Sequence, residues 1–170
     1  MSKNFFSEKE LELLNEIFQM SEEMVADYYK MSDSDWDKIK YDFKTLKDLK
    51  SHEIVDGPFA QVVKYDAKPW KSLFNSSVYT VYRICVQDNV VLDRIKKYRL
   101  PVAALFFYIA VHELIHVVRF SKYLKKFEAE GEEMMQEEKK VHDITREILE
   151  KTGVSGRTEV VSFFVRHLPY

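Results

Sequence analysis

The sequence predicts an α+β fold, namely one mainly helical domain with a small antiparallel sheet and a central buried helix. Three observations support this class. Apolar residues recur at helical spacing near both ends of the chain, β-forming residues concentrate between residues 54 and 95, and an almost purely apolar run follows Pro101. With 170 residues, of which 46% are apolar, the chain fits a single domain over residues 1–170. Its expected parts are N-terminal helices (1–50), the sheet (54–95) and two long helices (101–151).

The N-terminal part carries the signals of two helices. Ser7 and Glu10 form a capping box, and the apolar residues after them keep helical spacing, which predicts a helix over residues 8–31. Ser and Asp residues at 32–35 offer new N-caps, so a second helix is predicted over about residues 35–50. The apolar residues of this second segment recur at intervals of three and four: Trp36, Ile39, Phe43, Leu46 and Leu49.

The middle of the chain is expected to form two or three short antiparallel strands. Its segments are rich in Val, Tyr, Phe and Ile and are separated by turn-forming residues. The pattern consists of a turn at 56–58, strands at 59–64, 78–86 and 90–92, and an interruption at 68–70. The single cysteine, Cys85, falls inside the apolar pattern and is expected to be a small buried residue.

Two long helices should follow the sheet. Pro101 suits the first turn of a helix that runs to about Phe120, and this helix is apolar nearly all round, so it should be the central one. After a bend that includes Gly131, another helix is predicted over about residues 132–151, with Gly153 at its C-terminus. The last segment, residues 160–165, is β-prone.

Composition and charge narrow the function classes. The formal net charge is −2 and no basic block is interleaved with aromatic residues, so we expect no nucleic-acid binding. The uninterrupted apolar run, residues 101–111, is short for a membrane span, and we expect none. One cysteine allows no internal disulfide, and the N-terminal residues lack the apolar core of a signal peptide. We therefore expect a cytoplasmic protein, whose oligomeric state the sequence does not indicate.

The motif that indicates chemistry is H-E-x-x-H at residues 112–116, inside the central helix. His112 and His116 are four residues apart, so both lie on one helix face and can bind one metal ion. Glu113 lies between them and can act as general base toward a water on that metal. The metal that this motif most often binds is Zn²⁺, although another divalent metal is compatible with the same ligands.

A third ligand is expected on the helix at 132–151. At about 100° per residue, Glu138 lies ~35° from the centre of the apolar stripe of that helix. His142 lies one turn further along, ~75° from the centre, on the same flank. A buried carboxylate is costly without a partner, and a metal shared with the two histidines would provide one. Glu138 is the leading candidate, His142 the next, and Glu137 and Glu133 follow.

This arrangement resembles the gluzincin class of zinc metallopeptidases, of which thermolysin is a member. In that class an H-E-x-x-H helix is followed by a helix with a glutamate ligand, and a residue four positions later supports the site. The resemblance covers about residues 105–150 and implies His112, His116 and Glu138 as ligands and Glu113 as general base. It also implies that His142 supports the site or binds the metal itself. A histidine at that position departs from the family pattern, in which Asp or Asn is usual.

Several alternatives remain open from the sequence. A fourth ligand would close the site and make the metal structural in a non-catalytic protein. A di-iron carboxylate protein needs a second Glu-x-x-His unit, which the sequence lacks. The residue that would stabilise an oxyanion is not determined by spacing, and the candidates are Tyr108, Tyr123, Arg119, Arg146 and His167. The function we expect is zinc-dependent hydrolysis of a peptide or protein substrate.

Overall fold

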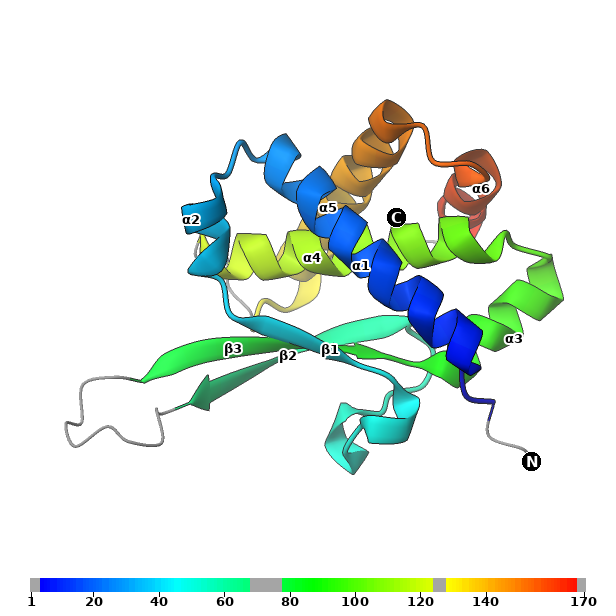
Figure 1. Cartoon of the computed structure of the whole chain (residues 1–170), viewed down its shortest axis with the longest axis horizontal. Helices are drawn as coiled ribbons and strands as arrows, with labels where there is room; N and C mark the ends of the chain where they lie inside the picture. Colours follow the sequence, from blue (N-terminus) through cyan, green and yellow to red (C-terminus); the bar gives the residue numbers. More distant parts are fainter. Residues whose placement is uncertain (1–3, 68–77, 124–127, 168–170) are drawn as a thin grey trace.

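The computed structural model describes residues 4–67, 78–123 and 128–167. Helices form most of the described chain, and three strands form one sheet (Figure 1). The helices are α1 (Glu8–Tyr28), α2 (Asp33–Asp37), α3 (Asp88–Tyr98), α4 (Val102–Ser121), α5 (Gly131–Thr152) and α6 (Arg157–His167). The strands are β1 (Tyr41–Lys44), β2 (Ala60–Ala67) and β3 (Tyr79–Val86), and two short 3-10 turns are η1 (Leu46–Asp48) and η2 (Ser51–Glu53). The predicted mainly helical α+β class is confirmed.

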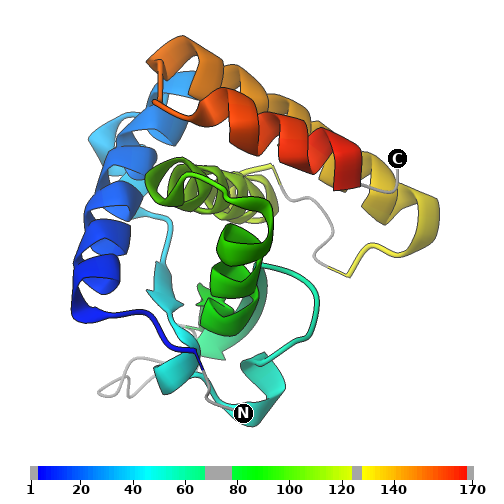
Figure 2. The same cartoon turned by 90° about the vertical axis from the view of Figure 1, so that its right-hand side faces the viewer.

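Helix α4 lies at the centre of the molecule. It contacts α1, α5, α6 and β2, and Figure 2 shows it between α1 on one side and α5 with α6 on another. By length and composition α4 could cross a membrane, but 78% of its most apolar window is buried inside the molecule. This burial is typical of a core helix, because an all-round apolar helix needs neighbours on every face. The predicted central position of this helix is confirmed.

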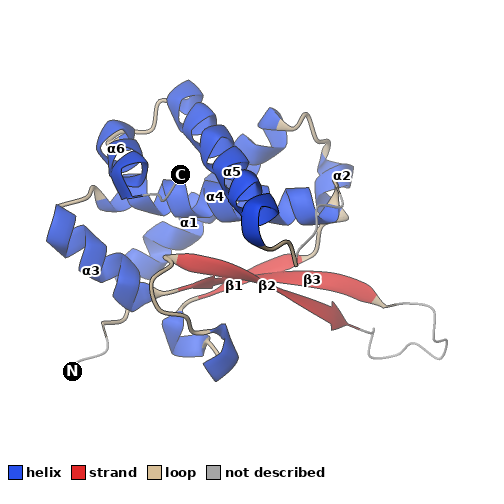
Figure 3. Ribbon diagram, turned by 180° about the vertical axis from the view of Figure 1, so that it is seen from behind, coloured by secondary structure: helices blue, strands red, loops and turns tan. Residues whose placement is uncertain are grey.

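The sheet has the order β1-β3-β2 and covers one side of the helical layer (Figure 3). Strands β2 and β3 pair antiparallel, as predicted, from Ala60 opposite Val86 to Ala67 opposite Tyr79. Strand β1 pairs parallel to β3, so the sheet is mixed rather than purely antiparallel. The connection from β1 to β3 is long enough to allow a parallel pair, because β2 lies between them in the chain. The interruption predicted at residues 68–70 lies outside the described residues.

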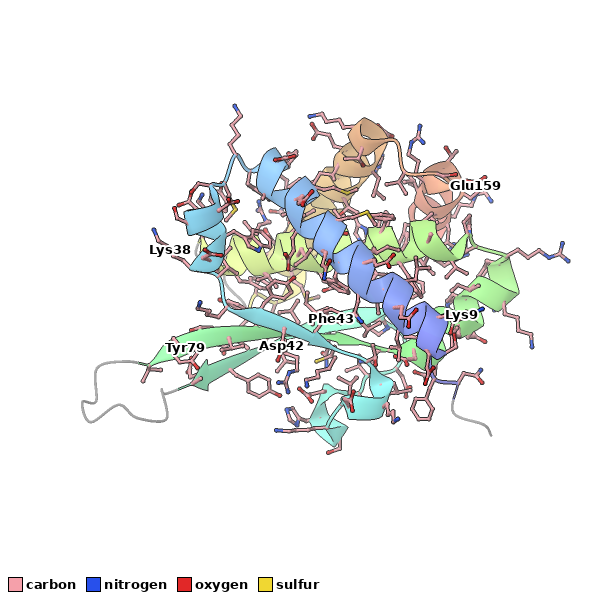
Figure 4. The ribbon with its side chains drawn as sticks, in the orientation of Figure 1. Lys9, Lys38, Asp42, Phe43, Tyr79 and Glu159 are labelled. Carbon is pink, nitrogen blue, oxygen red and sulfur yellow. The ribbon has the colours of Figure 1, made fainter. Side chains whose placement is uncertain are left out.

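The prediction of a second helix over residues 35–50 is wrong. Only α2 is helical there, and the chain then enters β1 and the two 3-10 turns. Phe43 points toward the helical layer and stacks on Phe18 of α1 with ring centroids 4.0 Å apart, while Asp42 faces the opposite side of the sheet (Figure 4). Pairing with β3 and packing on α1 therefore override the helical spacing of the apolar residues.

Two segments predicted as strands are helices. Residues 90–92 belong to α3, and residues 160–165 belong to α6. In α6 the buried residues are Val160, Phe163 and Phe164, which is the i, i+3, i+4 spacing of a helix face. The first predicted helix, in contrast, is confirmed from residue 8, with its Ser7 and Glu10 capping box, and ends at Tyr28 instead of residue 31.

A close approach at Gly156 sets the position of α6. Its φ is +82°, a left-handed value that favours glycine. A Cβ at this residue would lie 2.9 Å from Cβ of Pro101 and 3.2 Å from Cβ of Ala104. The turn before α6 therefore packs directly on the beginning of α4, and α6 runs alongside the central helix.

The outer face of the sheet holds a polar cluster around Glu53 of η2. This carboxylate is buried and accepts hydrogen bonds from Tyr65 Oη (2.8 Å) and Arg83 Nη1 (3.2 Å), and from the Lys50 N–H (2.9 Å). Burial opposes the charged form of Glu53, but these hydrogen bonds hold its pKa below the usual range. The cluster fastens the irregular segment after β1 to the sheet. Cys85, buried as predicted, lies beside it.

We expect Glu53→Gln to lower the free energy of unfolding by about 1–2 kcal/mol at pH 7, because charge-assisted hydrogen bonds are lost. A carboxyl with a lowered folded-state pKa stabilises the fold above its unfolded pKa of about 4.3. That contribution disappears as the pH falls below this value, so the difference between the two proteins should shrink there. Urea unfolding at pH 7 and pH 3.5 measures it, with exposed Glu12→Gln as control. An unchanged difference at both pH values would contradict the prediction.

Candidate metal centre

Helices α4 and α5 bring three of the predicted ligands together. His112 and His116 lie one turn apart on the face of α4 that meets α5, and Glu138 reaches them from α5. His116 Nε2 is 2.9 Å from Glu138 Oε1, and His112 Nε2 is 3.4 Å from Glu138 Oε2. One ligand atom from each residue lies within 4.8 Å of the others. The three side chains therefore point at one small volume.

His142 lies beside this cluster. Its Nε2 is 3.9 Å from Glu138 Oε2, and its ring centroid is 4.3 Å from that of His112. Its other ring nitrogen, Nδ1, is 2.5 Å from the hydroxyl of Tyr108 on α4. Burial, together with the charge of His112, lowers the pKa of His142 to about 3. A neutral imidazole, fixed by Tyr108, thus stands next to the three candidate ligand residues.

The electrostatics of the cluster favour an ionised Glu138. Burial opposes its charge, but hydrogen bonds with His112 and His116 hold its pKa well below the usual range. Burial likewise opposes protonation of His116, yet the hydrogen bond and charge of Glu138 raise the pKa of His116 overall. The carboxylate is thus satisfied by the imidazoles, through the same atoms that would face a bound cation.

Packing holds the two histidine rings in place. The His112 ring lies parallel to Tyr108 with centroids 6.2 Å apart, and the His116 ring stacks on Phe120 at 5.5 Å. Their Nδ1 atoms are buried and have no hydrogen-bond partner within the described part of the chain. Histidine ligands usually donate this N–H to an oxygen, which orients the ring and raises metal affinity. Among the described residues, aromatic packing, and not such a hydrogen bond, orients the two rings.

Glu113 has a different environment from the three ligand candidates. Its side chain is largely buried, and burial raises its pKa while the neighbouring imidazoles oppose that effect. It nevertheless lines the same pocket as His112, His116 and Glu138. A carboxylate with a raised pKa next to a ligand cluster is a frequent feature of general bases.

The cluster opens into a pocket of about 730 Å³, large enough for a small-molecule or peptide ligand. Its walls come from the segment before β2, from β2 and from α3, α4, α5 and α6. The apolar part of the wall includes Phe59, Val62, Tyr98, Ile109, Met134, Phe163 and Phe164. The three candidate ligand residues thus line a pocket of substrate size, with Glu138 the most exposed of them.

The remaining sequence candidates lie elsewhere or have other partners. Glu137 lines the pocket but forms a two-point ion pair with Arg119, and Glu133 is exposed. Arg146 pairs with Asp143 away from the pocket. Of the residues considered for oxyanion stabilisation, Tyr108 and His167 line the pocket: Tyr108 stands next to the cluster, and His167 is exposed on α6.

The donor set fits a divalent metal. Two imidazole nitrogens and one carboxylate oxygen are the ligands of many catalytic zinc sites, which keep a fourth position for water. Comparison with family models, curated proteins and solved structures finds no match to this chain. The fold and the site thus define an α+β domain with a His-His-Glu cluster in the lining of a pocket.

Proposed function

We propose that this protein is a zinc-dependent hydrolase, most specifically a peptidase of the gluzincin type. One observation carries the proposal: the three ligand candidates and Glu113 line the same 730 Å³ pocket. A structural metal site is normally closed, whereas a catalytic one must be reached by substrate and water. The position of Glu113 next to the ligands, with access to the pocket, supports catalysis over a purely structural role.

In this proposal His112, His116 and Glu138 hold the metal, and zinc suits their nitrogen and oxygen donors. When bound, zinc lowers the pKa of a coordinated water and polarises the substrate carbonyl. His142 lies beside Glu138, with its Nε2 3.9 Å from Glu138 Oε2, and the hydroxyl of Tyr108 fixes the His142 ring through Nδ1. Such supporting contacts typically change metal affinity or activity 10- to 100-fold.

Glu113 takes the water proton and delivers it to the leaving amide nitrogen. Its place beside His112 and His116, within the same pocket, suits both steps, because a proton-transferring group must lie within hydrogen-bond reach of the water and of the leaving nitrogen. The buried surroundings limit competing water around the carboxylate. The same residue therefore acts first as general base and then as general acid.

A peptide is favoured as substrate because β2 is an edge strand of the sheet and lines the pocket. In the order β1-β3-β2, β2 pairs with β3 on one side only within the described residues. Ala60, Gln61 and Val62 of β2 contribute to the pocket wall. An exposed strand edge binds extended peptides through main-chain hydrogen bonds. The edge would therefore align a peptide bond with the cluster on α4.

Metal removal tests the proposed function directly. We expect the zinc-loaded protein to release peptides from fluorescein-labelled casein, and dipicolinate to abolish that release. Addition of Zn²⁺ in slight excess should restore it, whereas Mg²⁺ should not, because Mg²⁺ prefers oxygen ligands. Elemental analysis of the same samples follows the bound metal. Stoichiometric zinc without any hydrolysis of casein would refute the peptidase proposal and leave a structural metal site.

A further inference from the structure

The pocket extends beyond the ligand cluster to a basic end near the start of α4. There α3 and α6 contribute Arg94, Lys97 and His167 to the lining. A neighbouring pocket shares part of this wall and adds Arg99 and Arg166. Four residues that carry a permanent positive charge at neutral pH thus gather at one end of the site, on α3, on the residue after it and on α6.

An aromatic wall connects the cluster with this basic end. The ring of His112 faces Tyr108, and Tyr108 stacks on Phe164 with centroids 3.9 Å apart. Phe164 contacts Phe163 at 5.4 Å, and Phe163 stacks on His167 at 4.4 Å. Of these rings, Tyr108, Phe163 and Phe164 are largely buried, and their pocket-lining edges connect the cluster with the basic residues, so an apolar substrate segment is favoured between them.

The acidic residues of the pocket that contains the cluster lie at the other end, and Glu159 lines only the neighbouring pocket. The carboxylates that line the cluster's own pocket are Glu113, Glu137 and Glu138, which belong to the cluster or stand next to it. Glu137 is already paired with Arg119. At the basic end Arg94 binds Asp93, whose side chain is 61% exposed and which does not line the pocket. Since a guanidinium carries five N–H donors, this pair leaves donors of Arg94 for a ligand.

The helix dipole alone does not account for the positions of the basic residues at this end of the pocket. Cations are favourable in the last turn of a helix, and this effect would account for both Lys96 and Lys97 of α3. Of these two lysines, Lys97 lines the pocket and Lys96 does not. Arg94 lies a turn earlier, where the dipole effect is weak, and it lines the pocket as well.

We propose that the basic end of the pocket is a subsite for a carboxylate of the peptide substrate, bound by Arg94 and Lys97. This rests on the proposed function and narrows it to peptides with an apolar segment followed by an acidic side chain or a free C-terminus. Arg binds a carboxylate with two parallel hydrogen bonds, and Lys adds a point charge. Since Arg94 is partly exposed and Lys97 is exposed, binding should weaken as salt increases.

Fluorescence anisotropy with four labelled peptides tests the subsite without hydrolysis. The protein is zinc-loaded Glu113→Gln, and each peptide has an N-terminal fluorescein followed by Gly-Gly-Ala-Leu-Phe-Ala. The peptides end in Glu-Glu or Gln-Gln, each as the free acid or the amide. We expect the neutral Gln-Gln amide to bind about tenfold more weakly than the Glu-Glu acid, which corresponds to about 1.4 kcal/mol. The two mixed peptides show whether the side chain or the terminus supplies the carboxylate.

Variants test whether Arg94 and Lys97 cause the preference for peptides that carry a carboxylate. Arg94→Gln with Lys97→Gln should abolish the difference between the peptides, and Lys96→Gln, exposed on the same helix but outside the pocket, should keep it. Equal affinity for all four peptides, no binding of any, or a preference that persists in the double variant would overturn the subsite. A wild-type protein that shows this preference but never hydrolyses peptides would instead refute only the proposed function.

Discussion

His116→Ala is expected to lower zinc affinity by more than about a hundredfold, since removal of a supporting residue alone reduces it 10- to 100-fold. The ring nitrogen of His116 is the cluster atom nearest to Glu138, at 2.9 Å, and water cannot easily replace it in a buried position. His112→Ala should have a similar effect, because its Nε2 faces the other oxygen of the same carboxylate. Competition with a zinc-specific dye, together with elemental analysis, measures both.

Two further variants serve as comparisons for the measurement of zinc affinity. His52→Ala removes an exposed histidine of η2 outside the pocket and should leave zinc binding unchanged. His142→Ala separates an open site from a closed one, because a fourth ligand would contribute as much as His116, whereas a supporting residue would contribute less. Unchanged zinc affinity in His112→Ala and His116→Ala, with the fold intact by circular dichroism, would exclude the site.

The long helices could be predicted because each has local signals that agree with its tertiary role. A capping box opens α1, Pro101 precedes α4, and Gly153 ends α5 in a left-handed conformation. Their apolar stripes are long enough to indicate one helical face. The pairing of α4 with α5 then follows, because the apolar face of α5 must be buried against something, and α4 is apolar all round.

The short elements could not be predicted in the same way. Apolar residues at 36, 39 and 43 fit a helix, but residues 41–44 form a strand because β3, about forty residues later, offers them a partner. The segment at 160–165 is rich in β-branched and aromatic residues, yet it forms α6 because Val160, Phe163 and Phe164 pack on the central layer. Non-local packing decides both cases, and local propensity does not contain it.

The ligand cluster could be predicted from the sequence, whereas part of the pocket wall could not, again because non-local packing decides the structure there. Glu138 could be identified because helical spacing alone places it near the apolar stripe of α5, and the structure brings it to His112 and His116. The parts of the pocket wall that come from α3 and α6 could not be predicted, because residues 90–92 and 160–165 are expected from the sequence to be strands. A helical reading of 157–167 would have aligned Phe163 and Phe164 on one face and directed attention to that wall.

Glu113→Gln is expected to reduce peptide hydrolysis by about 10²- to 10⁴-fold while zinc binding stays within about twofold, because general acid–base catalysis typically contributes that much. Glutamine has nearly the same shape as glutamate and cannot accept the water proton. The ligands themselves are unchanged, so the metal site should survive. Steady-state kcat/KM on a peptide substrate, with bound zinc measured in the same preparation, tests both halves of the prediction.

The stability of Glu113→Gln decides between a catalytic and a structural role for this residue. In the metal-free protein a buried carboxylate destabilises the fold, so a neutral side chain of the same shape should leave the free energy of unfolding of that form equal or higher. A structural Glu113, in contrast, would lower stability on replacement and hydrolysis would fall only in proportion to the folded fraction. Loss of hydrolysis with stability retained is the combination expected of a residue kept for catalysis at the expense of stability. Retained hydrolysis in a zinc-loaded, folded variant would remove Glu113 from the mechanism.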